Sequence, residues 1–327
     1  MPSEPKDGLG PFNPMNPYLV LTDSDVKALI DYDVAIAAME DALRELSAGT
    51  LIAPPRCSLH TELGSLVFTA GAATGRVRAL GFRVYDTFAG SSTDTDQIVA
   101  IFDPDRARLA GVIIGGLIGG MRTGALGGVA VKYLARPDAQ VLALVGAGFQ
   151  ARSQLRAAFA VRSFRRVVIA SRTRSAALEL RKEVLEDYRV ECSVVDSPKE
   201  AVQDADVVFC ATTSTTPVIE AGWIKAGAHV TTVGPKLRDA HELPSDIGER
   251  CAIVATDSPA QLAAYDRFFL YTGPAPIGLH QIIAKPQRGR TDSRQITLYC
   301  SVGLAGTEVV LGNEVLRRAA ELNSRAS

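Results

Sequence analysis

Two glycines and an alanine, placed between an apolar run and a helical pattern, form the clearest chemical signal in the sequence. The apolar run is Val141–Val145, and Gly146, Gly148 and Ala151 follow it with the spacing G-x-G-x-x-G/A. In this pattern the first glycine permits a tight turn, the second lets the backbone approach a pyrophosphate, and the third small residue allows close helix–strand packing. The N–H groups at the helix start would bind the phosphates. We therefore expect a dinucleotide site, the alternative being a simple strand–turn–helix corner.

The residues after the next predicted strand indicate which dinucleotide binds. Sites for NAD usually carry Asp or Glu about 20 residues after the glycines, where the carboxylate accepts from the ribose 2′-OH. Here Ser171 takes that position, and Arg172 and Arg174 follow it. A hydroxyl and two guanidinium groups suit a 2′-phosphate, because arginine binds phosphate through paired hydrogen bonds and stacks on adenine. We expect NADP(H) to be preferred over NAD(H), the alternative being a solvated basic turn.

Strand-like and helix-like patterns alternate around and after this glycine turn, which indicates parallel βαβ units. Thr212, Thr213 and the pair Val233–Gly234 follow predicted strands, at the carboxyl ends where ligands bind in such sheets. The predicted strands are Val141–Val145, Val167–Ala170, Glu191–Val195, Val207–Ala211, His229–Val233, Ala252–Ala255 and Ile296–Ser301, with predicted helices at Ala176–Asp187 and Pro198–Gln203.

The first third of the chain has a different pattern. Short strand-like runs are separated by clusters of Gly, Asp, Ser and Thr, as in an antiparallel or mixed sheet. A helix capped by Asp33 precedes most of these runs, a helix rich in small residues is predicted over Arg122–Leu134, and another over Gly306–Asn323. The predicted strands are Tyr18–Leu21, Arg56–His60, Ser65–Thr69, Arg78–Tyr85, Gln97–Phe102 and Ala110–Ile114.

Length and composition limit the class of protein. The 327 residues suit about two domains, and 47% apolar residues with a net charge of −1 are typical of a globular protein. Without a basic excess, we expect no nucleic-acid partner and no anionic membrane surface. No apolar run is long enough to span a bilayer, and the first 16 residues lack the pattern of a signal peptide. The five dispersed cysteines indicate a reducing, cytoplasmic location, and the four histidines show no metal-ligand spacing.

Several motifs together carry a resemblance to a known family. They are Met121–Ala125, Lys132–Pro137, Val145–Ala151, the segment Ala201–Val208 with Ala211-Thr-Thr and Pro217, and Ser301–Ala305. With these motifs the chain resembles the ornithine cyclodeaminase/mu-crystallin family over nearly its whole length. Members of that family use NAD(P)H to interconvert amino acids with imino or keto acids. Their activities include cyclodeamination, amino-acid dehydrogenation and ketimine reduction.

The resemblance implies an α/β fold with two parts. One is a Rossmann domain, a doubly wound parallel sheet that binds the dinucleotide, which we assign to residues 125–303. The other is a mixed α/β substrate-binding and dimerisation domain, which we assign to residues 1–124 and 304–327. The resemblance also implies a homodimer and a C-terminal helix that returns to the first domain.

The family's substrate-binding arginines have counterparts in this chain. Arg56, after Pro54 and Pro55, and Arg122 match the two arginines that bind the substrate carboxylate. This arrangement makes physical sense, because each guanidinium can give two charge-assisted hydrogen bonds to one carboxylate. Thr123 follows Arg122 as in the family, and we expect both to contact the cofactor.

Two family positions carry other residues. A family lysine is replaced by Arg83, which either binds a substrate anion or forms a structural ion pair with Asp86 or Asp96. The family's catalytic aspartate is replaced by Lys236. With three arginines nearby, we expect a strongly cationic pocket that lowers the pKa of Lys236. A bare ammonium substrate would be repelled, since a like-charge pair at ~4 Å costs about 1–4 kcal/mol at effective dielectric constants of about 80 to 20.

These departures favour one function among three. We expect an NADPH-dependent oxidoreductase that reduces an imino or keto carboxylic acid, either a dicarboxylic one or a neutral cyclic imine. Lys236 would be its proton donor or electrostatic stabiliser, unless it faces a cofactor phosphate or solvent and water gives the proton. The alternatives are an ornithine/lysine cyclodeaminase or amino-acid dehydrogenase that releases ammonia, and an NADPH-dependent binding protein without turnover. The predicted cofactor-binding residues are Arg122, Thr123, Gly146, Ala147, Gly148, Phe149, Gln150, Ser171, Arg172, Thr173, Arg174, Thr212, Thr213, Val233, Gly234, Ser301 and Gly303.

Overall fold

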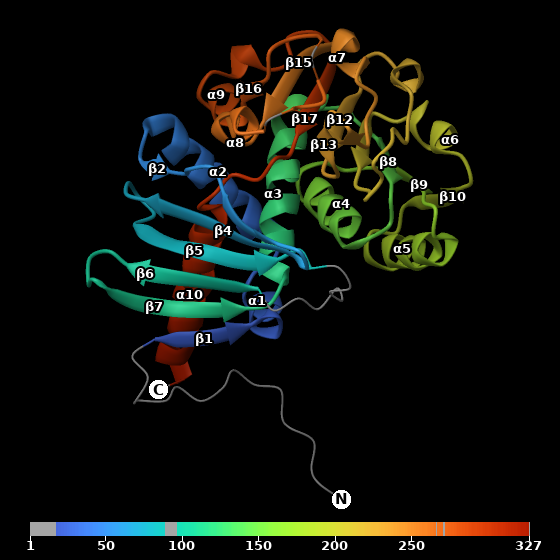
Figure 1. Cartoon of the computed structure of the whole chain (residues 1–327). Helices are drawn as coiled ribbons and strands as arrows, with labels where there is room; N and C mark the ends of the chain where they lie inside the picture. The colour runs from blue at the N-terminus through green and yellow to red at the C-terminus, as the bar shows by residue number, and fades with distance from the viewer. Residues whose placement is uncertain (1–17, 89–96, 266, 271, 327) are drawn as a thin grey trace, which may run out of the picture.

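Two β-sheets lie on either side of a long central helix (Figure 1). The computed structural model describes residues 18–88, 97–265, 267–270 and 272–326, and all structural statements below concern these residues. None of the helices within these ranges combines the length and the apolar character that crossing a bilayer requires.

The first sheet is mixed, as the sequence predicts. Its order in the described chain is β1-β7-β6-β5-β4-β2, with β3 paired to β4; β1 runs parallel to β7 and the other pairs are antiparallel. The strands are β1 (Leu19–Thr22), β2 (Leu51–Ile52), β3 (Cys57–Thr61), β4 (Gly64–Ala73), β5 (Ala79–Asp86), β6 (Ile98–Asp103) and β7 (Arg108–Ile114).

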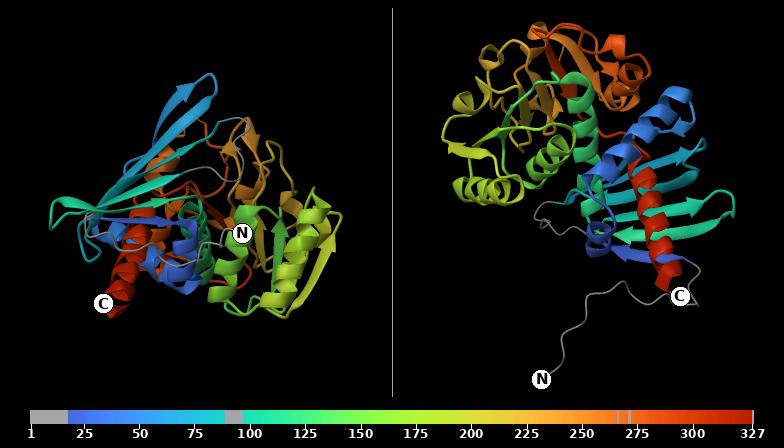
Figure 2. Two further views of the ribbon diagram at one scale, coloured as in Figure 1. Left: turned by 90° about the horizontal axis from the view of Figure 1, so that it is seen from below. Right: turned by 180° about the vertical axis from the view of Figure 1, so that it is seen from behind.

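Helices cover one face of this sheet and leave the other face open. The helices are α1 (Asp23–Leu29), α2 (Tyr32–Ala48) and α10 (Thr307–Ala326). The front view shows the bare face, and the rear view shows α10 lying across the sheet (Figures 1 and 2). Local signals set the limits of α2, since the side chain of Asp31 caps its first turn and Gly49 ends it with φ 75°. The C-terminal helix thus returns to the first sheet.

The second sheet is parallel throughout its described strands, and its order is β10-β9-β8-β11-β12-β17-β15-β16. The chain reverses its direction of travel across the sheet between β8 and β11, which is the switch point of a doubly wound fold. The predicted α/β class is therefore confirmed. The strands are β8 (Val141–Val145), β9 (Arg166–Ala170), β10 (Glu191–Val195), β11 (Val207–Cys210), β12 (His229–Thr232), β15 (Cys251–Thr256), β16 (Ile277–Gly278) and β17 (Ile296–Cys300).

Helices again join these strands. The longer ones are α4 (Phe149–Val161) and α5 (Arg174–Asp187), and the shorter ones are α6 (Pro198–Val202), α7 (Ile247–Arg250), α8 (Pro259–Ala263) and α9 (Leu279–Ala284). A two-stranded ladder, β13 (Lys236–Leu237) with β14 (Ala240–His241), follows β12. Short 3₁₀ turns lie at Ala221–Trp223 and Pro286–Arg288.

The central helix α3 (Leu117–Leu134) belongs to both halves, and nearly all of its residues are buried. Its predicted start at Arg122 was wrong, because the helix begins at Leu117. The carboxylate of Asp23 accepts from the backbone N–H groups of Gly116 and Leu117, and this distant cap lets a glycine-rich run become helical. The domain boundary expected after residue 124 falls inside α3, and these domain limits stay a prediction.

Small residues on α3 allow α4 to pack very closely. A Cβ on Gly124 would lie 2.6 Å from the backbone oxygen of Ser153, and one on Gly127 would lie 1.8 Å from Oε1 of Gln154. The side chain of Ser153 also links three elements, because it contacts the Tyr32 hydroxyl and donates to the Gly120 carbonyl. This packing fixes the second sheet's glycine turn relative to the first sheet.

Candidate active site

A pocket of about 410 Å³ lies at the carboxyl ends of β8, β9 and β11. Gly146 has φ 108°, and a Cβ there would come within 2.4 Å of the Ala211 carbonyl, so only glycine fits. A Cβ on Gly148 would meet nothing within 4 Å, which leaves the backbone open to an approaching phosphate. The turn thus has the shape that a pyrophosphate requires. The pocket is lined by Val145, Gly146, Ala147, Gly148, Ala170, Ser171, Arg172, Thr173, Asp196, Pro198, Ala211, Thr212, Thr213, Ser214 and Val218.

The basic residues expected at the ribose end have different surroundings. Arg172 lines the pocket directly. Arg174 instead forms an ion pair with Asp196, an acidic residue of the pocket wall that no sequence motif indicated. One of the two predicted phosphate-binding arginines is therefore engaged by a carboxylate.

Glu242 holds the strand ends that face this pocket. Its buried carboxylate accepts from the backbone N–H groups of Thr212, Val233 and Gly234, and from the hydroxyls of Thr212 and Thr232. A Cβ on Gly234 would lie 2.5 Å from this carboxylate. Glu242 therefore ties β11 to β12.

The other predicted cofactor residues lie on α4, α3 and the loop after β17. Phe149 is the first residue of α4, and its ring packs against Gly120 of α3. The Oε1 atom of Gln150 is buried without a partner among the described residues. Thr123 is buried and donates its hydroxyl to the Gly119 carbonyl, and Ser301 donates its N–H to Thr232.

Arg56 and Arg122 converge beside Gly303, which has φ 92°. From the position of a Cβ on Gly303, both Nη atoms of Arg122 lie within 3.8 Å and Nη1 of Arg56 lies 3.9 Å away. Asp257 fixes this loop, because its carboxylate accepts from the backbone N–H groups of Val302, Gly303 and Leu304. Two guanidinium groups from distant parts of the chain thus meet at one point, as a carboxylate site requires.

Arg56 is held by residues that no sequence motif indicated. Its backbone N–H donates to Oε1 of Gln261, and its Nη2 donates to the hydroxyl of Tyr265 at 2.6 Å. Burial works against the charge of Arg56, but the nearby Tyr265 and Tyr85 outweigh it, so the pKa is raised. Arg56 therefore stays cationic and oriented.

Arg83 forms the structural ion pair that was one of its two predicted roles, but with a different partner. Its Nη1 donates to Glu308 at 2.9 Å and its Nε donates to Gln97 at 3.0 Å. Its Nη2 donates to Gln97 as well, and the guanidinium lies 4.2 Å from the ring centre of Tyr85. Asp86 is not the partner, and Asp96 lies outside the described residues. Each nitrogen of the Arg83 head group already has a protein acceptor.

Lys236 lies buried on β13, where its Nζ donates to the Gly234 carbonyl. Its pKa is lowered, and the largest cause is burial; Glu242, Cys300 and Asp257 oppose this effect and Arg56 adds to it. The pKa of Lys236 is shifted in the predicted direction. The predicted cause was crowding by arginines, but Arg56 makes the smallest of the contributions named here. The strongly cationic pocket also needs correction, because Glu308, Glu242 and Asp257 lie among the basic groups.

Comparisons with known proteins place the chain in a family. The model of the "Ornithine cyclodeaminase/mu-crystallin family" matches residues 17–322. The chain belongs to the ornithine cyclodeaminase/mu-crystallin family. Among its curated relatives, the Delta(1)-pyrroline-2-carboxylate reductase of Bacillus cereus is 31% identical over 320 residues, which cover 93% of this chain and 97% of that protein.

Solved structures of the family have the same fold. The Delta(1)-pyrroline-2-carboxylate reductase of Thermococcus litoralis, solved with NADH and L-proline, is 29% identical, with a TM-score of 0.83 over 93% of this chain and 98% of that one. An archaeal alanine dehydrogenase dimer with bound NAD is 26% identical, with a TM-score of 0.82 over 94% and 97% of the two chains. The family assignment made from motifs is therefore confirmed.

The candidate site contains both basic and acidic side chains. It combines Arg56, Arg83, Arg122 and Lys236 with Glu242, Asp257 and Glu308. These are four basic and three acidic side chains. The roles of the predicted site residues stay predictions, and the acidic residues that position them were missed, because their motif context resembles that of ordinary loop or helix acids.

Proposed function

We propose that this family member reduces the C=N bond of an imino carboxylic acid, or the C=O bond of the keto acid, with NADPH. The observation that carries the proposal is the convergence of Arg56 and Arg122 beside Gly303, in a chain whose glycine turn lines a pocket that suits a dinucleotide. Relatives that reduce such bonds, the pyrroline-2-carboxylate reductases and the ketimine reductase mu-crystallin of Macropus fuliginosus, support it.

Each of these side chains has a separate role in the proposed reaction. Arg56 and Arg122 hold the substrate carboxylate by charge-assisted hydrogen bonds, which orients the adjacent C=N carbon. The reduced nicotinamide, when bound, supplies a hydride to that carbon. Lys236 carries a proton on Nζ and gives it to the nitrogen, so the C=N bond becomes CH–NH. Burial lowers the pKa of Lys236, which makes it a stronger acid than an exposed lysine.

The alternatives fit the site less well. An ammonium substrate needs a carboxylate to face it, and Lys236 stands where the resemblance implies the family's aspartate. The buried carboxylates of Glu242 and Asp257 already accept from several backbone N–H groups, so they are committed to holding the loops. A binding protein without turnover needs only the nucleotide pocket and the two arginines. The first experiment separates it from an enzyme.

We also propose NADPH over NADH and a homodimer. The nucleotide preference depends on Ser171, Arg172 and Thr173, which line the pocket, and not on the relatives, since the Thermococcus enzyme was solved with NADH. The dimer would use the bare face of the first sheet. That face exposes large apolar side chains, and the archaeal alanine dehydrogenase was solved as a dimer. The exposed side chains are Val20, Phe68, Leu80, Phe82, Ile98 and Ile114.

The function is tested with a substrate panel. We expect NADPH oxidation, followed by absorbance at the nicotinamide band, with cyclic imines that carry a carboxylate, and with 2-oxo acids plus ammonia. Arg122→Met should lower kcat/KM by at least tenfold, because one of the two carboxylate-binding groups is lost. Tight NADPH binding without turnover on every member of the panel would instead support the binding protein.

The role of Lys236 predicts a pH profile. A general acid must be protonated, so kcat should be constant at low pH and fall as pH rises through the pKa of Lys236, below the ordinary value of 10.5. Lys236→Met should remove this limb and lower kcat by about 10²–10⁴-fold. A variant that keeps the full rate and the same profile would show that water or the substrate supplies the proton.

The nucleotide preference is tested at Arg172. Arg172→Ala should weaken NADPH binding by about tenfold or more and leave NADH binding within about twofold, because only NADPH carries the 2′-phosphate. Titration of the nicotinamide fluorescence measures both constants. Arg189→Ala, a change of another basic residue in the same half of the chain, serves as the control. An equal loss of affinity for NADPH and NADH would mean that Arg172 does not bind the 2′-phosphate.

The dimer is tested on the bare sheet face. Phe82→Asp should convert the protein to a monomer in light scattering after gel filtration, because it places a charge in an apolar interface. Leu178→Asp is the matched control, since Leu178 is an exposed apolar residue on α5, in the other half of the molecule. If the wild-type protein is already a monomer by the same measurement, the proposed dimer is wrong.

A further inference from the structure

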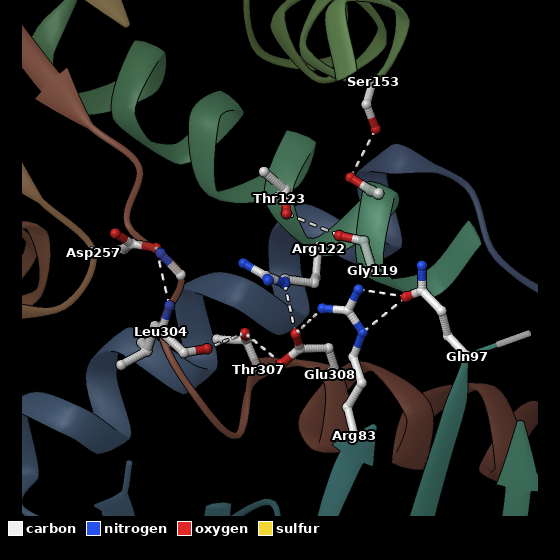
Figure 3. A network of polar contacts seen from close by, with 12 residues as sticks. Arg83, Gln97, Gly119, Arg122, Thr123, Ser153, Asp257, Leu304, Thr307 and Glu308 are labelled. Carbon is white, nitrogen blue, oxygen red and sulfur yellow. Dashed lines mark hydrogen bonds and ion pairs between the residues drawn. The ribbon is translucent and has the colours of Figure 1, made fainter. Parts of the chain in front are cut away.

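Glu308 occupies an unusual position between two arginines. It is fully buried in the first turn of α10, where the N-terminal end of the helix favours a negative charge. One oxygen, Oε1, accepts from Nη1 of Arg83 at 2.9 Å and from Nε of Arg122 at 3.0 Å (Figure 3). The other oxygen lies 3.3 Å from the hydroxyl of Thr307. A single carboxylate therefore bridges two guanidinium groups from β5 and α3.

The two arginines of this bridge differ in how many of their nitrogens already have an acceptor. Each of the three nitrogens in the head group of Arg83 already has an acceptor, because Gln97 accepts from its Nε and Nη2 while Glu308 accepts from its Nη1. Arg122 gives only its Nε to Glu308. Its Nη1 is buried and has no partner within the described chain, and both of its Nη atoms lie close to Gly303. Of these two arginines, Arg122 is therefore the one that keeps a nitrogen without any acceptor in the described chain and can offer it to a ligand.

We propose that Glu308 is a specificity-determining positioning residue, which holds Arg83 out of substrate binding and limits the site to substrates with one carboxylate. The inference builds on the carboxylate site of the proposed function. Glu308 acts in two ways. It fixes the plane of Arg122 through Nε so that the Nη atoms face the loop at Gly303, and it cancels the charge of Arg83, which would otherwise attract a second carboxylate.

The charge of the bridge supports this limit. Glu308 cancels one of the two positive charges of Arg83 and Arg122, so Arg83 adds no net charge that could hold a second carboxylate. Burial lowers the pKa of Arg83, with the neighbouring Glu308 acting against that shift. A substrate with a second carboxylate would have to break the contacts of Arg83 with Glu308 and Gln97 before it gained a partner. Of the two substrate types expected from the sequence, the dicarboxylic one is therefore disfavoured and the monocarboxylic cyclic imine is favoured.

The test compares two five-carbon ligands that differ only in their terminal group, which is a methyl group in 2-oxopentanoate and a carboxylate in 2-oxoglutarate. Calorimetry measures the Kd of each ligand for the protein saturated with NADP⁺. We expect wild type to prefer 2-oxopentanoate. Glu308→Gln should shift the ratio of the two Kd values by at least tenfold toward 2-oxoglutarate, because Arg83 is released. If this variant does not fold, Glu308→Asp keeps the charge but is too short to bridge both arginines, and it should shift the ratio in the same direction.

Two further variants separate the released guanidinium from a general disturbance. Arg83→Met combined with Glu308→Gln should return the ratio to near the wild-type value, because no guanidinium is released while the amide oxygen of the introduced glutamine can still accept from Arg122. Glu314→Gln is the matched control, since Glu314 lies on the same helix and pairs with Arg317 and Arg318 near the surface. It should leave both Kd values unchanged.

The outcomes distinguish this inference from the proposed function. If 2-oxopentanoate binds to wild type and Arg122→Met weakens it, but neither Glu308 variant moves the ratio, the role of Glu308 is overturned and the carboxylate site stands. An equal shift in the double variant overturns the role as well, since Arg83 would not be needed. If Arg122→Met binds 2-oxopentanoate as well as wild type does, the carboxylate site itself is wrong.

Discussion

The site depends on one constraint, which is that buried cations must be balanced by buried carboxylates that are themselves fully hydrogen-bonded. An unpaired ion in a protein interior costs several kcal/mol, whereas a pair with good geometry recovers most of that cost. Glu308 meets the requirement for Arg83 and Arg122 by bridging them. Glu242 and Asp257 favour the charged form of the nearby Lys236 without a direct hydrogen bond to it, while they also hold the strand ends. The acidic residues therefore organise the site as much as the arginines do.

This constraint explains why both ends of the chain are needed. Arg83 comes from the first sheet, Arg122 from the central helix and Glu308 from the C-terminal helix, so the charges balance only when all three are assembled (Figure 3). The glycines of α3 bring the same helix into close contact with α4, whose first turn faces the nucleotide pocket. A shift of α3 would therefore disturb the carboxylate site and the glycine turn together.

Local features of this fold were predictable, and distant pairings were not. The limits of β8 and β10 agree with the prediction at both ends, because an apolar run and a turn are signals contained in a few residues. The limits of β9, β11, β12, β15 and β17 agree within one residue, whereas the two-residue strand β16 was not predicted. The start of α3 was missed because its cap, Asp23, lies 93 residues away from Gly116. The partner of Arg83 was missed for the same reason, since Glu308 is 225 residues distant.

The resemblance indicated which basic residues gather better than it described the chemistry of the site. It predicted Arg56, Arg122 and Lys236 as neighbours, and the structure brings Arg56 and Arg122 to a common point. The motifs contain the basic residues of the site but not the acidic residues that folding brings beside them. A strongly cationic pocket was predicted for this reason. Lys236 is buried, and Glu242 and Asp257 partly offset the cost of burying its charge. A buried lysine is thus tolerated where the surrounding loops are held by carboxylates, and the substrate that such a site accepts follows from the whole set of charges.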